Sequence, residues 1–408
     1  MSTGRGRTLR GDRLHIGFFG RRNAGKSSLI NAVTNQAAAI VSEIPGTTTD
    51  PVFKPMELHP LGPVVLIDTA GLDDGGDPLG TLRKERTVAV LKKTDLALLV
   101  VDGNSTNFAF EDGLVQEFEN EHIPYLIVLN KVDLQLSPET EKWLLEKTHM
   151  RVSSKNRTGI DELKKKIAEI APKEWEPPFM RDLVHPGDVI VLVAPIDLGA
   201  PKGRLIMPQV KALRDVLDAA GIAMMCRESE LALTLQKLNQ KPALVVTDSQ
   251  AFTQVAATVP PEVALTSFSI LSARQKGDLD ELVKGVNAVK NLKPGDRVLV
   301  AEYCTHHPQE DDIGRKKIPR WLNDHVGGVL QFDTVVGSDF PADLKDYNLV
   351  VHCGACTANR KEIMGRIKQA AEQGIPITNY GIMISYLKGV FPRALKPLEN
   401  CIAPTRNK

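Results

Sequence analysis

The amino-acid sequence predicts the α/β fold class, with three domains that each contain a parallel sheet covered by helices. Three observations support this prediction. The chain has 408 residues, whereas a single domain usually holds roughly 100 to 200. Short apolar runs alternate with helical stretches along most of the chain, which is the pattern of β-α-β units. The segment PKEWEPPF interrupts the alternation, because proline fits neither a helix interior nor a sheet ladder.

The composition is that of a globular protein, with 42% hydrophobic and 25% charged residues. The 51 Lys and Arg residues nearly balance the 50 Asp and Glu residues, so the net charge of +1 creates no field that would attract nucleic acid. The apolar run from Val189 to Ile196 is far shorter than the roughly 20 residues that span a bilayer. We therefore expect no nucleic-acid partner and no membrane span. Residues 1–12 contain no apolar signal core, so we expect a disordered N-terminus and a cytoplasmic protein.

The first domain is predicted over residues 13–172, where the apolar runs HIGFFG, VVLIDTA, LALLVVD and YLIVLN alternate with helical stretches. Residues 173–182 are predicted to form a linker. The middle domain, residues 183–268, repeats the alternation over about four strands. The third domain, residues 269–408, contains the strands RVLVAEYC and LVVHCGAC. A capping box predicts that its long helix starts at Asn359.

A phosphate-binding loop opens the first domain. Residues 20–27, GRRNAGKS, match the pattern GxxxxGKS between an apolar strand and a helix, which is the context that the pattern requires. Backbone N–H groups at such a helix N-terminus bind phosphates, Lys26 neutralises the β- and γ-phosphates, and the Ser27 hydroxyl binds Mg²⁺. The expected nucleotide contacts in this loop are Gly20, Asn23, Ala24, Gly25, Lys26, Ser27 and Ser28.

Two further motifs supply groups for the γ-phosphate and Mg²⁺. One of the hydroxyls of Thr47, Thr48 and Thr49 is expected to bind the metal ion. Asp68 ends a second apolar strand, where its carboxylate can hold Mg²⁺ through water, and the Gly71 N–H can reach the γ-phosphate. We therefore assign Lys26, Asp68 and Gly71 to the catalytic site.

Base recognition is predicted from two later motifs. Asn130, Lys131 and Asp133 form an Asn-Lys-x-Asp run at a strand end, where the aspartate can accept hydrogen bonds from guanine N1–H and N2–H₂. Adenine lacks this pair of donors, so the run favours GTP over ATP. The segment Ser153, Ser154 and Lys155 lies where a backbone N–H usually meets guanine O6.

These five elements resemble those of the translation-factor-related GTPases, in detail the TrmE and Era branch, over residues 13–171. The resemblance implies that Asn23 binds K⁺ in place of an arginine finger and belongs to the catalytic site. The alternative is that Asn23 only stabilises the loop. Leu72 follows the Asp-Thr-Ala-Gly run, where Ras-like enzymes place a water-orienting glutamine, and leucine cannot orient water. A slow GTPase that depends on Mg²⁺ and K⁺ is therefore expected.

The third domain carries a metal-binding pattern. Cys304-x-His306 and His352-Cys353-x-x-Cys356 each follow an apolar strand, and the carboxyl ends of parallel strands lie at one edge of a sheet. The dipole of the helix after Cys356 stabilises a thiolate. The spacing alone suits either structural zinc or a 4Fe-4S cluster held by the three cysteines. A cluster would leave one iron for a weaker ligand, and His306 and His352 are the candidates for it.

The order of these domains resembles the FeFe-hydrogenase maturation GTPases, the HydF family, across nearly the whole chain. The resemblance implies a homodimer formed through the middle domain and a 4Fe-4S cluster in the third. It also implies a scaffold that receives a di-iron precursor, made with two radical-SAM maturases, and delivers it to apo FeFe-hydrogenase. The main alternative, an RNA-associated GTPase with a structural zinc module, is disfavoured by the near-neutral charge. A zinc protein with a vestigial GTPase is disfavoured because every phosphate and base contact is present.

Overall fold

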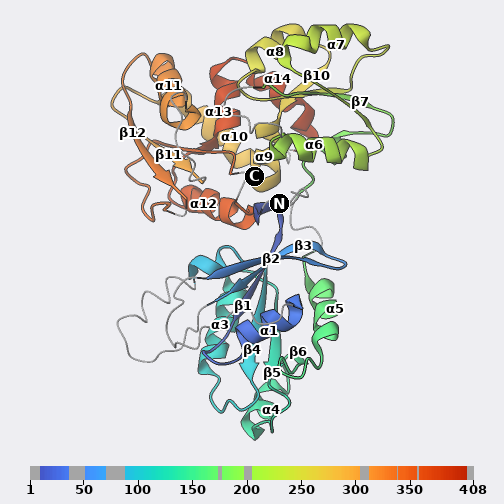
Figure 1. The fold of residues 1–408 in the computed structure, drawn as a ribbon. Coiled ribbons are helices and arrows are strands. Elements are labelled where there is room, and N and C mark those ends of the chain that lie inside the picture. The colour runs from blue at the N-terminus through green and yellow to red at the C-terminus, as the bar shows by residue number, and fades with distance from the viewer. Residues whose placement is uncertain are drawn as a thin grey trace, which may run out of the picture. The chain divides into compact units, whose positions relative to one another are not determined.

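The computed structural model describes residues 10–35, 51–69, 88–172, 177–196, 205–303, 312–337, 339–355 and 358–401. The chain divides into two compact units, residues 1–175 and 176–408 (Figure 1). Within the described residues, the first unit contains one sheet and the second contains two. All three sheets are parallel or mostly parallel and are packed with helices, so the predicted α/β fold class is confirmed.

The first unit is built on a six-stranded sheet with the order β2-β3-β1-β4-β5-β6, in which only the β2–β3 pair is antiparallel. Its strands are β1 (Leu14–Phe19), β2 (Val52–Leu58), β3 (Gly62–Asp68), β4 (Leu96–Asp102), β5 (Tyr125–Asn130) and β6 (His149–Arg151). The main helices described in this unit are α1 (Lys26–Thr34), α3 (Ala109–Asn120), α4 (Pro138–Leu144) and α5 (Ile160–Ile170).

Helices cover both faces of this sheet, which explains why its central strands read as continuous apolar runs. Leu98 and Val100 of β4 pack in one apolar cluster with α1 and α5. The alternate residues Leu99 and Val101 pack in a second cluster with α3. The edge strand β2 is half exposed and contains Pro55, so no apolar run predicts it.

The middle sheet has the order β10-β9-β7-β8 and is entirely parallel. Its strands are β7 (Val189–Val193), β8 (Ile222–Cys226), β9 (Leu244–Thr247) and β10 (Ala264–Ser267). Its main helices are α6 (Met207–Asp218), α7 (Leu231–Lys237), α8 (Phe252–Thr258) and α9 (Phe268–Lys276). Each strand coincides with an apolar run of the sequence. Helix α9 has no amphipathic pattern, because seven of its nine residues are buried.

The third sheet has the order β12-β11-β13-β14 and is also parallel. Its strands are β11 (Arg297–Glu302), β12 (Gln331–Val336), β13 (Leu349–His352) and β14 (Ile377–Asn379). The α-helices described around it are α10 (Leu279–Asn287), α11 (Ile318–Val326), α12 (Arg360–Glu372), α13 (Tyr380–Leu387) and α14 (Phe391–Leu395).

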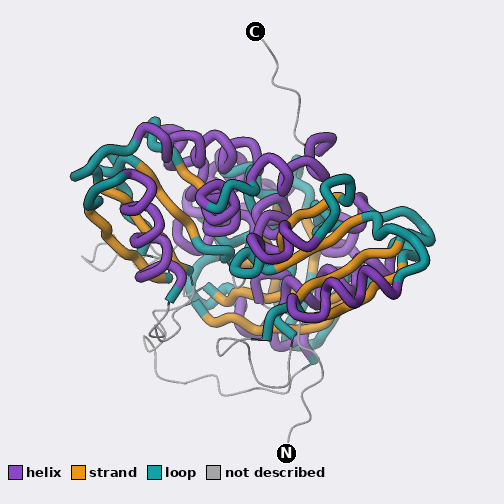
Figure 2. The backbone as a smooth tube through the Cα atoms, turned by 90° about the horizontal axis from the view of Figure 1, so that it is seen from above, coloured by secondary structure: helices purple, strands orange, loops and turns teal. Residues whose placement is uncertain are grey.

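One apolar cluster extends through both sheets of the second unit. The two sheets lie on opposite sides of this unit, with helices between them (Figures 1 and 2). Among these helices, α9 packs against α6 of the middle sheet and against α12 and α13 of the third sheet. The second unit therefore has a continuous core. In the described part of the chain, no helix is long and apolar enough to cross a membrane.

Candidate functional site

The phosphate-binding loop joins β1 to α1, and its two glycines are required by geometry. Gly20 has a φ of +139° and Gly25 a φ of +93°, both in the region that favours glycine. A Cβ atom at Gly20 would overlap the carbonyl oxygen of Val100, and one at Gly25 would overlap the side-chain amide of Asn130. The spacing of the motif thus reflects close approaches of the loop to β4 and β5.

The Lys26 side chain binds the backbone of the phosphate-binding loop. Its Nζ donates hydrogen bonds to the carbonyl oxygens of Gly20, at 2.8 Å, and Arg21, at 2.7 Å, and the residue is buried. These contacts hold the ammonium where it can bind phosphate oxygens. Asn23 has a φ of +62°, which asparagine tolerates better than most residues, and it is exposed.

The structure brings together Asp68 and Ser27, the two residues that the sequence assigns to Mg²⁺. Asp68 ends β3 opposite Phe18 of β1. Burial raises the pKa of the Asp68 carboxyl, while a hydrogen bond with Ser27 and the charges of Lys26 and Lys54 oppose this shift. A cation bound nearby would stabilise the ionised form of this buried carboxylate. Asp68 and Ser27 therefore offer the oxygen ligands that a hard metal ion such as Mg²⁺ prefers.

A second anchor of the loop was not predicted from the sequence. The Arg21 guanidinium binds Glu111 of α3 through two hydrogen bonds of 2.8 and 3.2 Å, and it also donates to the Asn107 carbonyl oxygen at 3.0 Å. The Glu111 side chain is only 1% exposed. The phosphate-binding loop is therefore tied to α3 by a paired buried charge. No local pattern marks Glu111, since it lies 90 residues from Arg21.

Asn130 links the phosphate-binding loop to the predicted base-recognition segment. Its Nδ2 donates to the Ala24 carbonyl oxygen at 3.0 Å. Its Oδ1 accepts hydrogen bonds from the backbone N–H of Ser154, at 3.1 Å, and from the Ser154 hydroxyl, at 2.9 Å. Because Asn130 is buried, these bonds fix the two loops relative to each other.

The Asp133 carboxyl group is held in its ionised form, which accepts hydrogen bonds. The Ser153 hydroxyl donates to its Oδ1 at 2.5 Å and lowers the pKa of Asp133, with help from Lys155 and Lys131. The Lys131 Nζ in turn contacts Asp102 Oδ2 at 2.6 Å. The two predicted base-recognition segments are thus in contact through the pairs Asn130–Ser154 and Asp133–Ser153. Thr47, Thr48, Thr49 and Gly71 lie outside the described residues.

In the third sheet, the two strands that precede the halves of the metal-binding pattern end at one edge. Strands β11 and β13 are parallel neighbours, with Ala301 in register with His352, so both strands end at the same side. The Cys353 sulfur accepts hydrogen bonds from the backbone N–H groups of Tyr303, at 3.1 Å, and Ala355, at 3.4 Å. Such donors stabilise a thiolate, so the described part of the pattern fits a thiolate-bound metal centre.

The helix that follows the pattern begins as the sequence predicts. Asn359 caps α12 by accepting a hydrogen bond from the Glu362 N–H at 3.0 Å. Cys304, His306 and Cys356 lie outside the described residues. Within the described ranges, no group of three His, Cys, Asp or Glu side chains is placed to hold a metal ion.

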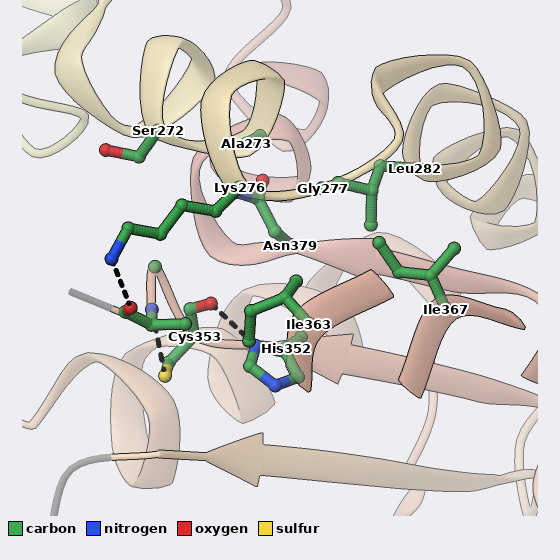
Figure 3. Close-up of a pocket in the computed structure, with 12 residues that line it drawn as sticks. Ser272, Ala273, Lys276, Gly277, Leu282, His352, Cys353, Ile363, Ile367 and Asn379 are labelled. Atoms are coloured by element: carbon green, nitrogen blue, oxygen red, sulfur yellow. Dashed lines mark hydrogen bonds between the residues drawn. The ribbon is translucent and has the colours of Figure 1, made fainter. Parts of the chain in front are cut away.

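His352 is buried, and contacts occupy both of its ring nitrogens. Its Nδ1 lies 2.8 Å from the Cys353 carbonyl oxygen, and its Nε2 lies 2.9 Å from Arg366 Nη1 (Figure 3 shows His352 beside Cys353). Burial and the charge of Arg366 lower the pKa of His352 to about 4. The ring is therefore neutral, with Nδ1–H donating and Nε2 accepting. Ligation of iron by Nε2 would require displacement of Arg366.

Arg366 itself was not singled out in the sequence. Its guanidinium lies over the rings of Tyr303, at 5.3 Å, and Phe340, at 5.0 Å, and it also donates to the Gly337 carbonyl oxygen. The Tyr303 hydroxyl donates to Glu362 Oε2 at 2.6 Å. These contacts hold the strand ends around Cys353. Only the Glu362 and Arg366 spacing on one helix face could have suggested them.

The fold and the nucleotide site define the first unit as a P-loop GTPase. A family model described as 50S ribosome-binding GTPase matches residues 15–131. The tRNA modification GTPase MnmE of Syntrophotalea carbinolica is 38% identical over 165 residues, which is 40% of this chain and 35% of that protein. MnmE of Aquifex aeolicus is 37% identical over 152 residues, or 37% of this chain and 33% of that protein. The chain thus spans about a third of the length of these curated relatives.

Among solved structures, the G domain of the T. maritima FeoB iron transporter matches 39% of this chain and 98% of its own, at 26% identity and a TM-score of 0.28.

Two further family models match the second unit. The hydrogen maturase F dimerization domain matches residues 179–277, and the hydrogen maturase F tetramerization domain matches residues 280–397. Together these two models cover more than half of the chain, which belongs to the hydrogen maturase F family.

Proposed function

We propose that this GTPase of the hydrogen maturase F family binds a 4Fe-4S cluster and delivers a di-iron precursor during the maturation of FeFe-hydrogenase. The observation that carries the proposal is the position of Cys353. Its sulfur accepts two backbone N–H groups at the shared end of β11 and β13, within the region that matches a hydrogen maturase F model. Cys304, Cys353 and Cys356 would hold the cluster, with His306 or His352 as the resting fourth ligand.

The cluster would supply an iron with an exchangeable position, and the di-iron precursor would be its cargo. The protein's own groups would stabilise thiolate charge through the Tyr303 and Ala355 N–H groups and the start of α12. We place the partners as apo FeFe-hydrogenase and two radical-SAM maturases, and the protein in the cytoplasm. No membrane partner is proposed, and no nucleic-acid partner is proposed, since the likeness to the tRNA modification GTPases covers only 37–40% of this chain.

In the proposed GTPase site, Lys26, Asp68 and Gly71 act on the γ-phosphate. Asn23 would hold K⁺, which would supply positive charge there, and Ser27 with one of Thr47, Thr48 and Thr49 would hold Mg²⁺. Hydrolysis is expected to be slow and to serve as a switch for partner binding. The contacts assigned to GTP remain Gly20, Asn23, Ala24, Gly25, Lys26, Ser27, Ser28, Thr47, Thr48, Thr49, Asp68, Gly71, Asn130, Lys131, Asp133, Ser153, Ser154 and Lys155.

The matched dimerization and tetramerization models imply that the protein self-associates. We propose a homodimer through the middle domain. The edge strand β8 and its neighbouring helix α6 support this, because each presents an exposed apolar residue: Ile222, 55% exposed, and Leu217, 60% exposed.

Anaerobic purification with iron, sulfide and zinc analysis tests the proposal. About four irons and four sulfides per chain are expected, together with activation of apo-hydrogenase after loading with the di-iron precursor. Protein that carries only zinc after reconstitution with iron and sulfide would reject the cluster and leave the zinc-module alternative.

A further inference from the structure

A buried lysine reaches the loop that carries Cys353. Lys276 is the last residue of α9 and is only 4% exposed. Its Nζ donates hydrogen bonds to the carbonyl oxygens of Ala358, at 2.6 Å, and Ala355, at 3.4 Å. Figure 3 shows its side chain extending from α9 to the loop beside Cys353. We define residues 353–355 and 358 as the Cys353 loop.

The small pocket that Lys276 lines contains apolar side chains as well as the polar Ser272, His352 and Asn379. Leu282, Ile363 and Ile367 line the same small pocket as Lys276 and Cys353. A charge buried in such a place is costly unless hydrogen bonds or an opposite charge compensate it. The two loop carbonyls provide part of that compensation.

A second cation ties the same end of α9 to the loop. Arg360, the first residue of α12, donates from Nη1 to the carbonyl oxygens of Gln275, at 2.7 Å, and Gly277, at 2.8 Å. These carbonyls stand at the negative end of the α9 dipole, so Arg360 neutralises a field that would oppose thiolate formation. The end of α9 and the start of α12 therefore form one junction around the Cys353 loop.

The junction also contacts the middle sheet's helices. Lys211 of α6 donates to the side-chain oxygen of Gln275 at 2.8 Å. Helix α9 itself starts directly after β10, with Ser267 as its N-cap. The position of the Cys353 loop is thus fixed by the part of the chain that matches the dimerization model.

We propose that Lys276 is a positioning residue for the metal centre: it holds the Cys353 loop on the end of α9 in the conformation that retains iron. The inference rests on the proposed cluster, but it also predicts loop behaviour in the metal-free protein. In both forms, the carbonyls of Ala355 and Ala358 lose their shared donor when Lys276 is replaced.

The experiment compares full-length wild type with K276M, K276R, K276Q and K284M. The last is the control, because Lys284 on neighbouring α10 is a 63% exposed lysine that forms an ion pair with Glu281, three residues earlier on the same helix. Hydrogen exchange of peptides covering residues 353–359 is measured in metal-free protein. Iron release to a chelator and the electron paramagnetic resonance spectrum are measured after reconstitution. Thermal melting reports folding.

K276M is expected to raise both the loop exchange rate and the iron-release rate about tenfold, as for the loss of one charge-assisted hydrogen bond. The resonance spectrum should shift, K276R should restore at least half of the iron retention, and K284M should match wild type. If K276M does not fold, K276Q replaces it, with the same expectations.

Loop exchange or iron release within twofold of wild type, in a folded variant, overturns the inference. A wild type that binds no iron rejects the proposed function instead. In that case the exchange rate alone decides whether Lys276 holds the loop.

Discussion

The nucleotide site and the Cys353 site use the same architecture but obtain their positive charge in different ways. Both lie at the carboxyl ends of parallel strands, and in both we propose that backbone N–H groups stabilise negative charge. In the first unit the buried cation, Lys26, belongs to the motif itself. In the second, the buried cations Lys276 and Arg366 lie on helices outside the metal-binding pattern. A sequence motif therefore identifies all the charged residues of a site only when those residues lie within the motif.

Replacement of a proposed ligand gives the largest effect that the comparison predicts. Cys353→Ser should lose most of the iron and all activation of apo-hydrogenase, because serine is a poor ligand for a cluster iron. Cys226→Ser, in the middle sheet, should keep the iron content of wild type. Iron and sulfide analysis with a maturation assay measures both. Full iron content in Cys353→Ser would remove this residue from the site.

Loss of the motif's own cation should affect only the first site. Lys26→Ala is expected to lower GTP hydrolysis by about 10²–10³-fold, as for other residues that stabilise transition-state charge. Its iron content should equal that of wild type, since the two sites lie in separate compact units. A parallel loss of iron would show that the sites are coupled through folding.

Base choice is the next effect in size. Asp133→Asn should weaken GTP binding by about 100-fold and favour xanthosine triphosphate, because the amide presents a donor where guanine presents one too. Asp161→Asn, a change of an 85% exposed aspartate on α5, serves as the matched control. Nucleotide titration of both variants measures the effect, and GTP affinity unchanged in Asp133→Asn would contradict it.

The ion pair between Arg21 and Glu111, which anchors the phosphate-binding loop, should contribute to the free energy of unfolding. Arg21→Ala leaves Glu111 buried without its partner, and we expect a loss of about 2 kcal/mol in the free energy of unfolding. The double variant with Glu111→Ala should be less destabilised than the sum of the single variants. Denaturant unfolding of all three separates these cases. Strict additivity would show that the pair does not act as a unit.

The smallest expected effect is that of the monovalent cation. Hydrolysis in K⁺ should exceed hydrolysis in Na⁺ by about tenfold, which corresponds to about 1.4 kcal/mol at the transition state. Asn23→Ala should abolish the difference while nucleotide binding persists. Rates are compared at equal ionic strength. Equal rates in the two salts with wild type would leave Asn23 as a loop-stabilising residue only.

The same contrast explains how much of the fold could be predicted. Strands such as β4 and β7 are buried along nearly their whole length, so their sequences are apolar runs that stand out. The edge strand β12 is half exposed and β14 has only three residues, and neither gave a signal. Helix α9 is buried on most sides and therefore lacks the one-sided pattern by which helices are recognised.

The predictability of the sites follows sequence separation. The phosphate-binding loop was visible because the loop residues expected to contact the nucleotide lie within nine consecutive positions, 20–28. The contact between Lys276 and Ala355 joins positions 79 residues apart, and the contact between Arg21 and Glu111 joins positions 90 apart. Neither residue type nor local spacing marks such pairs. They become visible only when the sheets have brought the strand ends together.

The continuous apolar core of the second unit has a consequence for the descent of the protein. The GTPase unit has its own closed core and has a counterpart in MnmE, so it can be passed between proteins as a module. The two sheets of the second unit both pack against α9. If the chain were divided between residues 277 and 280, the apolar residues of α9 would become exposed on the part that contains this helix. These two sheets are therefore expected to be inherited, lost and duplicated together.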